Sequence, residues 1–390
     1  MIDVHGQFAL IWHPRIRLPE EVIHVYFVSA VRVFLSSSVA IFLPLYFYLR
    51  MHSALAALSF ITLAFIFMGI SLLLLAALVR RASFEWLGLL STLFFVLLFA
   101  YVYSFPPNWQ SLIVSAVLFG IAGGIYWFPH HLIYSLYGRE RTSTAYGGEA
   151  VVNSVVSVVA PLVSGFVSAI FGFHVFFAVA SMFSILALFV WITHLKHRTV
   201  IDFSRMRSFY REIAWDRSLL YVIGGAITVP MVALPVYLAA VGVKNPAATV
   251  GWVYSLASLF GAFTSYLIGR YLDKEHDYAL GAVGFAVYAF LFMNLIAFPQ
   301  YSPYFLVFQG ILGALSVFPS DGWVYRIGAH NEGVEVFTRE FFLMLGRFLV
   351  ALWLIFSHPS VSAVIVVGAY LLVAYGLIFY YLARIKYSEV

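Results

Sequence analysis

The only long polar stretch of the chain is residues 196–217, KHRTVIDFSRMRSFYREIAWDR, in which six residues are Lys or Arg. The sequence on either side of it is dominated by long apolar runs. This stretch is too short to fold as a domain. It therefore predicts a linker at 196–217 between two apolar halves, residues 1–195 and 218–390.

The composition of both halves is that of a protein embedded in lipid. Hydrophobic residues make up 63% of the 390 positions and charged residues 10%, with a mean hydropathy of +0.96. A soluble domain carries about 25% charged residues, so this chain has too few to cover a surface facing water. Cysteine is absent, which excludes disulfides and cysteine-based metal or redox sites. We expect no cofactor and no bound metal.

Twelve apolar segments are long enough to cross a bilayer as helices, which needs about 20 residues each. They lie near 24–48, 54–79, 84–104, 109–136, 147–170, 173–195, 218–241, 249–271, 278–298, 303–325, 336–357 and 361–383. The expected fold is an all-α membrane protein of two six-helix bundles. The first segment is expected to remain as a membrane span rather than to be a cleaved signal peptide.

Lysine and arginine predict the orientation of these spans. Of the 22 Lys and Arg, 18 fall on the side of the linker and the termini, two (Arg50 and Lys244) on the other side, and two (Arg32 and Arg347) within spans. Positive residues concentrate in cytoplasmic loops. Both termini and the linker are therefore predicted to be cytoplasmic, in a plasma-membrane protein. Because the basic residues lie in short loops between spans, the net charge of +5 indicates topology and no nucleic-acid partner.

The two halves repeat at an almost constant offset. Leu43-Pro44-Leu45-Tyr46 matches Leu234-Pro235-Val236-Tyr237, with the prolines 191 positions apart. Residues 120–129, with the pattern GxxGx4FP, match residues 310–319 at an offset of 190, and Glu149 matches Glu340 at an offset of 191. Six helices per half give both copies the same orientation, so the pattern predicts a parallel repeat about an axis along the membrane normal. The alternative is that Pro and Gly are simply frequent in membrane helices.

Twelve spans, a polar middle linker and a six-plus-six repeat resemble the major facilitator superfamily over essentially the whole chain. Residues 269–274, GRYLDK, with Gly269, Arg270 and Asp273, are similar to the superfamily's signature in the loop after the second span of a half. The loop at 80–83, RRAS, keeps the basic pair but lacks the Gly and Asp of that signature. The resemblance implies transport by alternating access, with the first and fourth helices of each half lining the cavity.

A stripe of small and polar residues follows one face of the fifth span, with Glu149, Asn153, Pro161 and Gly165 spaced in multiples of four. Residues 160–165, APLVSG, resemble a Gly-Pro-x-x-Gly-Gly element associated with exporting antiporters, with two of the three glycines replaced. That resemblance implies export. Close helix packing is the alternative, since small residues let helix backbones approach.

Ionisable residues within spans mark a cavity, an ion pair or a proton path. Arg32 is a candidate anion-binding or counter-charge residue, or else part of an ion pair that holds the halves together. Glu149 is a candidate for proton exchange, or for a static pair with Arg139 or Arg141. Glu340 and Arg347 share a helix face, being seven residues apart.

Two histidines, His130 and His131, follow the helix proline Pro129, and Asp321 occupies the place of His131 in the second half. Neighbouring residues on a helix point about 100° apart, so the two histidines are not expected to share a metal. One of them is a candidate proton-sensitive residue of the cavity. The alternative is a hydrogen-bonded or interfacial role.

Aromatic and proline residues complete the candidate machinery. Tyr126, Trp127 and Tyr237 lie on helices that the resemblance implies line the cavity, and would suit a hydrophobic, aromatic or cationic organic solute. Pro44 and Pro235 each remove a helical hydrogen bond and are candidate hinges of a gate.

Together these features predict a secondary transporter of a small solute, coupled to protons and working as an efflux antiporter. No phosphate-binding loop supports transport driven by ATP. Short loops and the absence of a catalytic constellation argue against an enzyme. The alternatives are a sensor or assembly protein on a transporter scaffold, or a lipid flippase or scramblase.

Overall fold

The computed structural model describes residues 20–137, 142–195, 199–203, 215–275, 278–330 and 334–386. Within these ranges twelve helices are long and apolar enough to cross a membrane, and they coincide with the twelve predicted spans. The first half contains α2 (Glu20–Met51), α3 (Ala54–Leu78), α4 (Phe84–Ser104), α5 (Trp109–Tyr137), α6 (Thr142–Ile170) and α7 (Gly172–His194). The second half contains α9 (Trp215–Ala240), α10 (Pro246–Glu275), α11 (Leu280–Ala297), α12 (Ser302–His330), α13 (Val334–Ser357) and α14 (Val361–Tyr380).

Short elements connect or extend these helices. A 3₁₀ turn, η2 (Pro299–Tyr301), precedes α12, and a π-helical turn, η3 (Tyr381–Lys386), follows α14. Serine side chains cap several helix starts by accepting a backbone N–H, as Ser53 does from Ala56 and Ser360 from Ala363, each at 3.2 Å. Several helices run past the predicted ends, as α10 does, since a helix continues beyond the apolar run wherever backbone hydrogen bonding is favourable.

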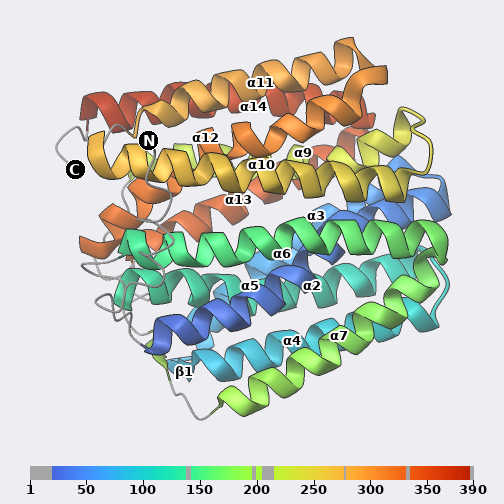
Figure 1. Cartoon of the computed structure of the whole chain (residues 1–390), viewed down its shortest axis with the longest axis horizontal. Helices are drawn as coiled ribbons and strands as arrows, with labels where there is room; N and C mark the ends of the chain where they lie inside the picture. The colour runs from blue at the N-terminus through green and yellow to red at the C-terminus, as the bar shows by residue number, and fades with distance from the viewer. Residues whose placement is uncertain are drawn as a thin grey trace, which may run out of the picture.

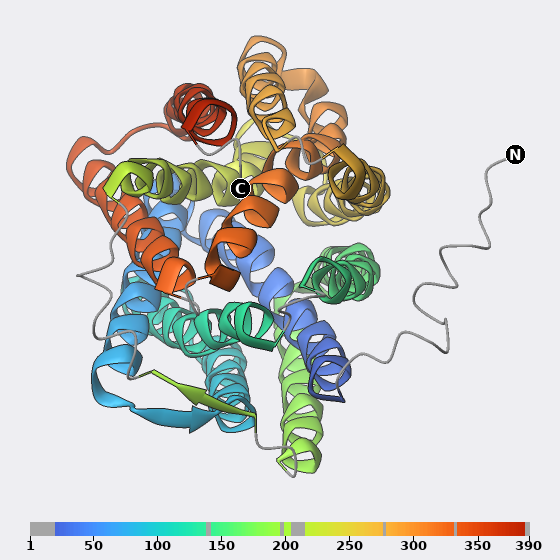
Figure 2. The same ribbon diagram turned by 90° about the vertical axis from the view of Figure 1, so that its left-hand side faces the viewer.

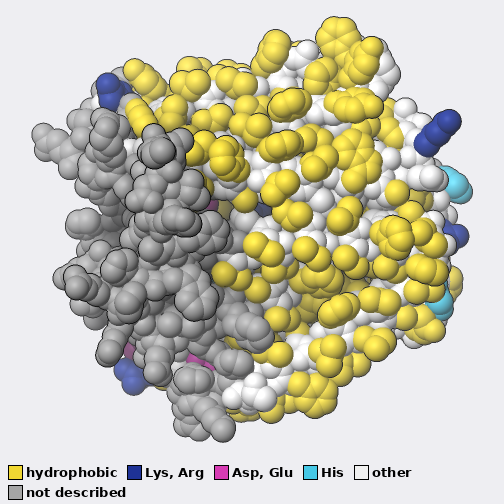
Figure 3. All heavy atoms as spheres, in the orientation of Figure 1, with side chains coloured by type: hydrophobic (Ala, Val, Ile, Leu, Met, Phe, Trp, Pro, Cys, Tyr) yellow, Lys and Arg dark blue, Asp and Glu magenta, His cyan; other side chains and the backbone are white. Residues whose placement is uncertain are grey.

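The helices run side by side along one direction (Figure 1), and seen end-on they form a lower group from the first half and an upper group from the second (Figure 2). We call the end where α2 begins and α7 ends the linker end, and the opposite end the far end. A band of hydrophobic side chains covers the face shown in Figure 3, and Lys, Arg and His side chains mark its far end. This distribution is the one expected of a lipid-facing surface.

Two pairs of helices make the main contacts between the halves, α6 with α10 and α3 with α13. Each pair joins the second helix of one half to the fifth helix of the other. This reciprocity is what a two-fold axis between the halves requires. The repeated prolines support it, because Pro44 and Pro235 lie inside α2 and α9, and Pro129 and Pro319 inside α5 and α12.

The small-residue stripe of α6 lies at one of these crossings. A Cβ on Gly165 would come within 2.7 Å of both the Ala247 carbonyl oxygen and the Gly251 Cα on α10, and a Cβ on Gly251 would come within 2.8 Å of the Pro161 carbonyl oxygen. Ser255 of α10 also donates a hydrogen bond to the Val158 carbonyl of α6, at 2.6 Å. The stripe therefore packs closely against α10 between the halves, which is compatible with the role in export that its sequence also suggests.

Two short strands, β1 (Arg81–Ser83) and β2 (Val200–Asp202), pair antiparallel with Ala82 opposite Ile201. The sequence did not predict them, because three-residue strands leave no periodicity and their partners are more than 100 positions apart. They attach the start of the linker to the loop at 80–83, the loop that departs from the superfamily signature (Figure 2).

Candidate functional site

Arg32 lies inside the first half, with 1% of its surface exposed. Its Nη2 donates to the Ala122 carbonyl of α5 at 2.9 Å, and its guanidinium carbon lies 4.0 Å from the ring centre of Phe95 and 4.9 Å from that of Tyr126. Nε and Nη1 have no hydrogen-bond partner among the described residues. The structure thus places a buried cation among α2, α4 and α5, held by one carbonyl and two aromatic faces.

Tyr126 belongs to the same buried cluster. Its ring stacks on His130 at 5.2 Å between ring centres and meets the edge of Trp127 at 5.5 Å. Phe84 and Trp191 close the cluster from α4 and α7. These aromatic residues therefore consolidate the first half at the linker end.

His131 and Glu340 join the two halves. His131 Nδ1 of α5 lies 3.3 Å from Glu340 Oε1 of α13, and the Glu340 side chain is only 5% exposed. Nearby, the rings of Phe128 and Phe337 meet edge to face at 5.2 Å across the same boundary. A titratable contact and an aromatic contact thus connect α5 to α13 near the linker end.

Charges of the second half surround Glu340. Arg339 Nη1 lies 3.6 Å from the Glu340 carboxylate, and the same guanidinium also binds Asp321 of α12. The candidates Asp321 and Glu340 are therefore brought into one network by Arg339, a residue considered above only for topology.

Arg347 lies two turns further along α13. Its Nε donates to Thr228 Oγ1 of α9 at 3.0 Å, and its guanidinium carbon sits 4.7 Å from the ring centre of Phe65 on α3. Sulfur atoms of Met344 and Met68 lie 3.4 and 4.0 Å from Nη1. Arg347 thus touches both halves at mid-depth, and does so without contacting Glu340 directly.

A second buried carboxylate of α13 was not singled out from the sequence. Glu335 Oε2 lies 3.1 Å from Arg217 Nη2, and Glu335 accepts a short hydrogen bond from the Tyr221 hydroxyl. Both partners belong to α9, so this ion pair lies within the second half. Its position in the first turn of a helix made it indistinguishable from interfacial surface charge.

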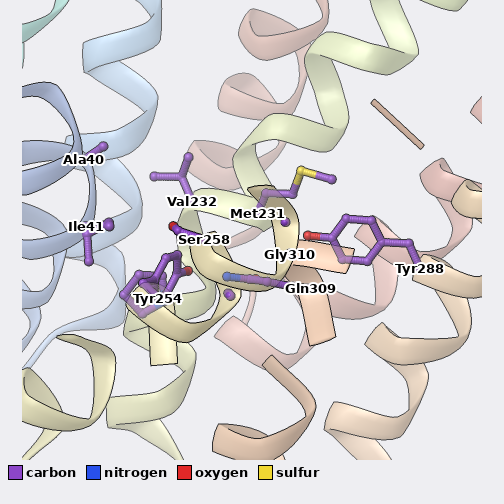
Figure 4. A pocket seen from close by; sticks show the side chains of 12 residues that line it. Ala40, Ile41, Met231, Val232, Tyr254, Ser258, Tyr288, Gln309 and Gly310 are labelled. Atoms are coloured by element: carbon purple, nitrogen blue, oxygen red, sulfur yellow. The ribbon is translucent and has the colours of Figure 1, made fainter. Parts of the chain in front are cut away.

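A cavity of about 360 Å³ (Figure 4) is lined by ten residues of the second half and by Ala40 and Ile41 of the first half. The residues that line the cavity come from α2, α9, α10, α11 and α12: Ala40, Ile41, Met231, Val232, Pro235, Tyr254, Ala257, Ser258, Gly261, Tyr288, Gln309 and Gly310. Of the predicted residues, only Pro235 belongs to it. Tyr254, Ala257, Ser258 and Gly261 follow helical spacing along one face of α10, a polar and small stripe that the abundance of Tyr and Gly in this chain concealed.

The remaining candidates are placed as follows. Tyr237 is buried, and its hydroxyl donates to the Leu295 carbonyl of α11 at 2.5 Å. Asn153 exchanges hydrogen bonds with Ser29, joining α6 to α2. Pro44 is inside α2. The side chains of Glu149, Arg270 and Asp273 and the surroundings of Gly269 lie outside what the structure describes, and the roles of these residues stay predictions.

No group of three or more His, Asp or Glu side chains with the arrangement of a metal site occurs in the described part of the chain. The two neighbouring histidines behave differently. His130 packs against aromatic rings of the first half, whereas His131 reaches the second half.

Comparisons with known proteins agree on the fold. The profile of the family described as Major Facilitator Superfamily matches residues 25–330. No curated protein sequence matches the chain. Solved structures of similar fold include a peptide transporter POT in complex with sulfate, with 15% identity, a TM-score of 0.67 and 94% of each chain covered. A POT family transporter in complex with 5-aminolevulinic acid shares 13% identity, with a TM-score of 0.67 over 92% of this chain and 95% of the other.

Proposed function

This chain belongs to the Major Facilitator Superfamily and is a secondary transporter, and we propose that protons drive its transport through His131 and Glu340. The observation that supports this proposal is their contact at 3.3 Å between the two halves. In alternating access, contacts between halves form and break once per cycle. A titratable contact at that place couples the cycle to proton binding.

The electrostatics of the pair indicate which protonation state favours the contact between the halves. With one proton on the pair, an imidazolium faces a carboxylate in a site of low dielectric, where their attraction is strongest. Removing that proton leaves a neutral imidazole, and adding a second one leaves a neutral carboxyl group. Either change weakens the contact, so the two halves are held together at the linker end most firmly when the pair carries one proton.

Charges on α13 itself and on α12 adjust this balance. Arg339 and Asp321 lie beside Glu340, and Arg347 lies on the same helix face toward the middle of the bundle. Arg339 keeps the carboxylate attracted to the second half when His131 departs. Glu340 therefore has a partner in both arrangements of the halves.

The test uses two carboxylates of one helix. Glu340→Gln keeps the shape of the side chain and removes its charge, and Glu335→Gln does the same to an ion pair within the second half. In proteoliposomes loaded with a pH-sensitive dye, solute-dependent proton flux is expected to vanish in Glu340→Gln and to persist in Glu335→Gln. Equal proton flux in both variants and in the wild type would refute coupling at Glu340.

We also propose that the linker end is cytoplasmic and the membrane is the plasma membrane. Arg81, Arg217, Arg339 and Arg384 lie toward the linker end, and Arg50 and Lys244 lie at the far end. The chain has no cysteine, so Val200→Cys and Lys244→Cys each carry a single thiol. A membrane-impermeant maleimide applied to intact cells is expected to label only Lys244→Cys. Labelling of Val200→Cys alone would show that the protein has the opposite orientation in the membrane.

For direction we propose export in exchange for protons, on the resemblance of residues 160–165 to the exporter element. Import with protons is the competing direction, and one solved structure of similar fold is described as a proton dependent oligopeptide transporter, with a TM-score of 0.64 and 13% identity. Solute movement in response to an imposed pH gradient across vesicles of known orientation distinguishes the two. If neither the wild type nor any variant moves solute or protons, the result would favour the role of a sensor or assembly protein.

A further inference from the structure

The described residues that line the cavity carry no formal charge. Its twelve lining residues include no Asp, Glu, Lys, Arg or His. A charged group placed in such a site loses its hydration and gains no ion pair in return, which disfavours its binding. The volume of about 360 Å³ lies at the small end of the range for ligand pockets, about 300–1,000 Å³.

The two sides of the cavity differ in chemistry. Ala40 and Ile41 of α2 and Met231, Val232 and Pro235 of α9 form an apolar side. Tyr254, Ser258, Tyr288 and Gln309 supply hydroxyl and amide groups from α10, α11 and α12 (Figure 4). An apolar body with one hydrogen-bonding edge is the ligand shape that fits this division.

One polar atom of the lining has no well-aligned hydrogen bond. The Tyr254 hydroxyl oxygen is buried, and the neighbouring Gln309 amide interacts with it without full hydrogen-bond geometry. A buried hydroxyl whose hydrogen bond is poorly formed carries a cost, and a ligand that hydrogen-bonds to it relieves that cost.

From this lining we propose that the cavity binds a small uncharged organic molecule, with its apolar part against α2 and α9 and a polar group at Tyr254 and Gln309. The inference rests on the transport function and adds the class of substrate. It narrows the expectation from the sequence, which included cationic solutes. It also separates this chain from a carrier of zwitterionic peptides, because neither charged end of a peptide finds a counter-charge in the lining.

Arg347 is the described charge that most directly competes with this assignment. It binds Thr228 of α9, one helical turn before Val232 of the cavity. An anionic solute long enough for its carboxylate to reach Arg347 would gain an ion pair there and could bind in spite of the uncharged lining. An anionic ligand therefore has to be part of the test.

A matched series that varies only charge tests the proposal. N-acetylphenylalaninamide is neutral, phenylalaninamide cationic, N-acetylphenylalanine anionic and phenylalanine zwitterionic. Equivalent sets built on tryptophan and leucine, together with the dipeptide alanylphenylalanine, complete the panel. Binding is measured on the purified full chain as ligand-dependent thermal stabilisation, since a ligand that binds only the folded state raises its stability.

The neutral member of each set is expected to bind at least about tenfold more tightly than its charged counterparts. Tyr254→Phe is expected to weaken it by about three- to tenfold, the value of one hydrogen bond. Ser258→Phe fills the cavity and is expected to abolish binding. Leu259→Phe places the same side chain on the exposed face of α10 and is expected to leave it unchanged.

Three results would overturn the assignment: a charged member or the dipeptide binding as tightly as the neutral one, neutral binding unaffected by Ser258→Phe, or no binding by any compound. Proton flux separates this inference from the proposed function. A charged solute that drives Glu340-dependent flux would leave coupled transport standing and refute the neutral cavity. If a neutral compound binds, Ser258→Phe abolishes its binding, and no solute drives proton flux, then the neutral cavity would stand and coupled transport would be refuted.

Discussion

His131 and Glu340 are 209 positions apart in the chain and 3.3 Å apart in the structure, on helices of different halves. The repeat conserves Glu340, whose counterpart in the first half is Glu149, but not His131, whose place on α12 is taken by Asp321. The repeat is therefore broken at one of the two residues that join the halves on this side. An asymmetric contact of this kind gives protonation a defined place to act.

Neutralising the pair is expected to loosen the linker end. In Glu340→Gln, spin labels at Val200→Cys and Tyr381→Cys, both on exposed positions of different halves, are expected to report a longer mean distance than in the parent. The reason is the loss of the attraction across the boundary. The same labels in Glu335→Gln serve as the control. An unchanged distance distribution in Glu340→Gln would mean that other contacts, among them that of Phe128 with Phe337, hold this side without the pair.

Bulk at the crossing of α6 and α10 is expected to disrupt the contact between the halves. Gly165→Leu places side-chain atoms where the Gly251 backbone lies, and overpacking of this kind costs about 1–3 kcal/mol or more. Thermal unfolding in detergent measures the loss. Gly313→Ala is the control, because a Cβ at Gly313 meets no atom within 4 Å. A Gly165→Leu protein as stable as the control would show that the helices part readily at this point.

Replacing Arg32 separates its two possible roles. Arg32→Met keeps the length of the side chain and removes a buried cation with two unsatisfied nitrogens, and Ala122 still accepts a hydrogen bond from Ser91 at 2.7 Å. Replacing buried charges by apolar side chains is often neutral or stabilising, by about 1–4 kcal/mol. We therefore expect an unchanged or higher melting temperature together with impaired transport. A marked fall in melting temperature would instead assign Arg32 to bracing α2 against α4 and α5.

The strand pair at the linker end is expected to depend on burial rather than on its ion pair. Ile201 is fully buried, whereas the side chains of Arg81 and Asp202, 3.0 Å apart, are 65% and 37% exposed. Ile201→Asp is expected to release β2 and to speed tryptic cleavage after Arg205, Arg207 or Arg211, and Arg81→Ala to change the rate little. Rapid cleavage in Arg81→Ala and slow cleavage in Ile201→Asp would reverse this assignment.

The spans could be predicted from the sequence because the thickness of the bilayer sets a minimum length for an apolar helix, and a run of that length is visible in the hydropathy. It also identified His131, Glu340, Asp321 and Arg347 as polar groups within or beside spans. Which of them meet depends on how α5 is rotated and shifted against α13, and helical periodicity within one segment carries no information on that. The cavity residues were missed for a different reason: Tyr254 and Gln309 acquire meaning only when α10 and α12 face the same space.

Arg32 illustrates the same limit. Its depth in α2 follows from residue count, but the depth alone does not say whether the side chain faces the boundary between halves or the interior of one half. The structure turns it toward Phe95 and Tyr126. The orientation of the Arg32 side chain depends on how α2 packs against α4 and α5.

The pairing of β1 with β2 moves the end of the first half beyond α7. Backbone hydrogen bonds join Phe84 to Thr199 and Phe203 to Arg80, and the Glu85 carboxylate accepts from the Thr199 backbone N–H at 3.2 Å. If the halves are produced as two separate polypeptides, a break at 195/196 would strip the first fragment of the strand that completes its loop. A break after Phe203 would leave that fragment with its own edge strand, so reassembly of the two fragments in a membrane should tolerate the later cut and fail at the earlier one.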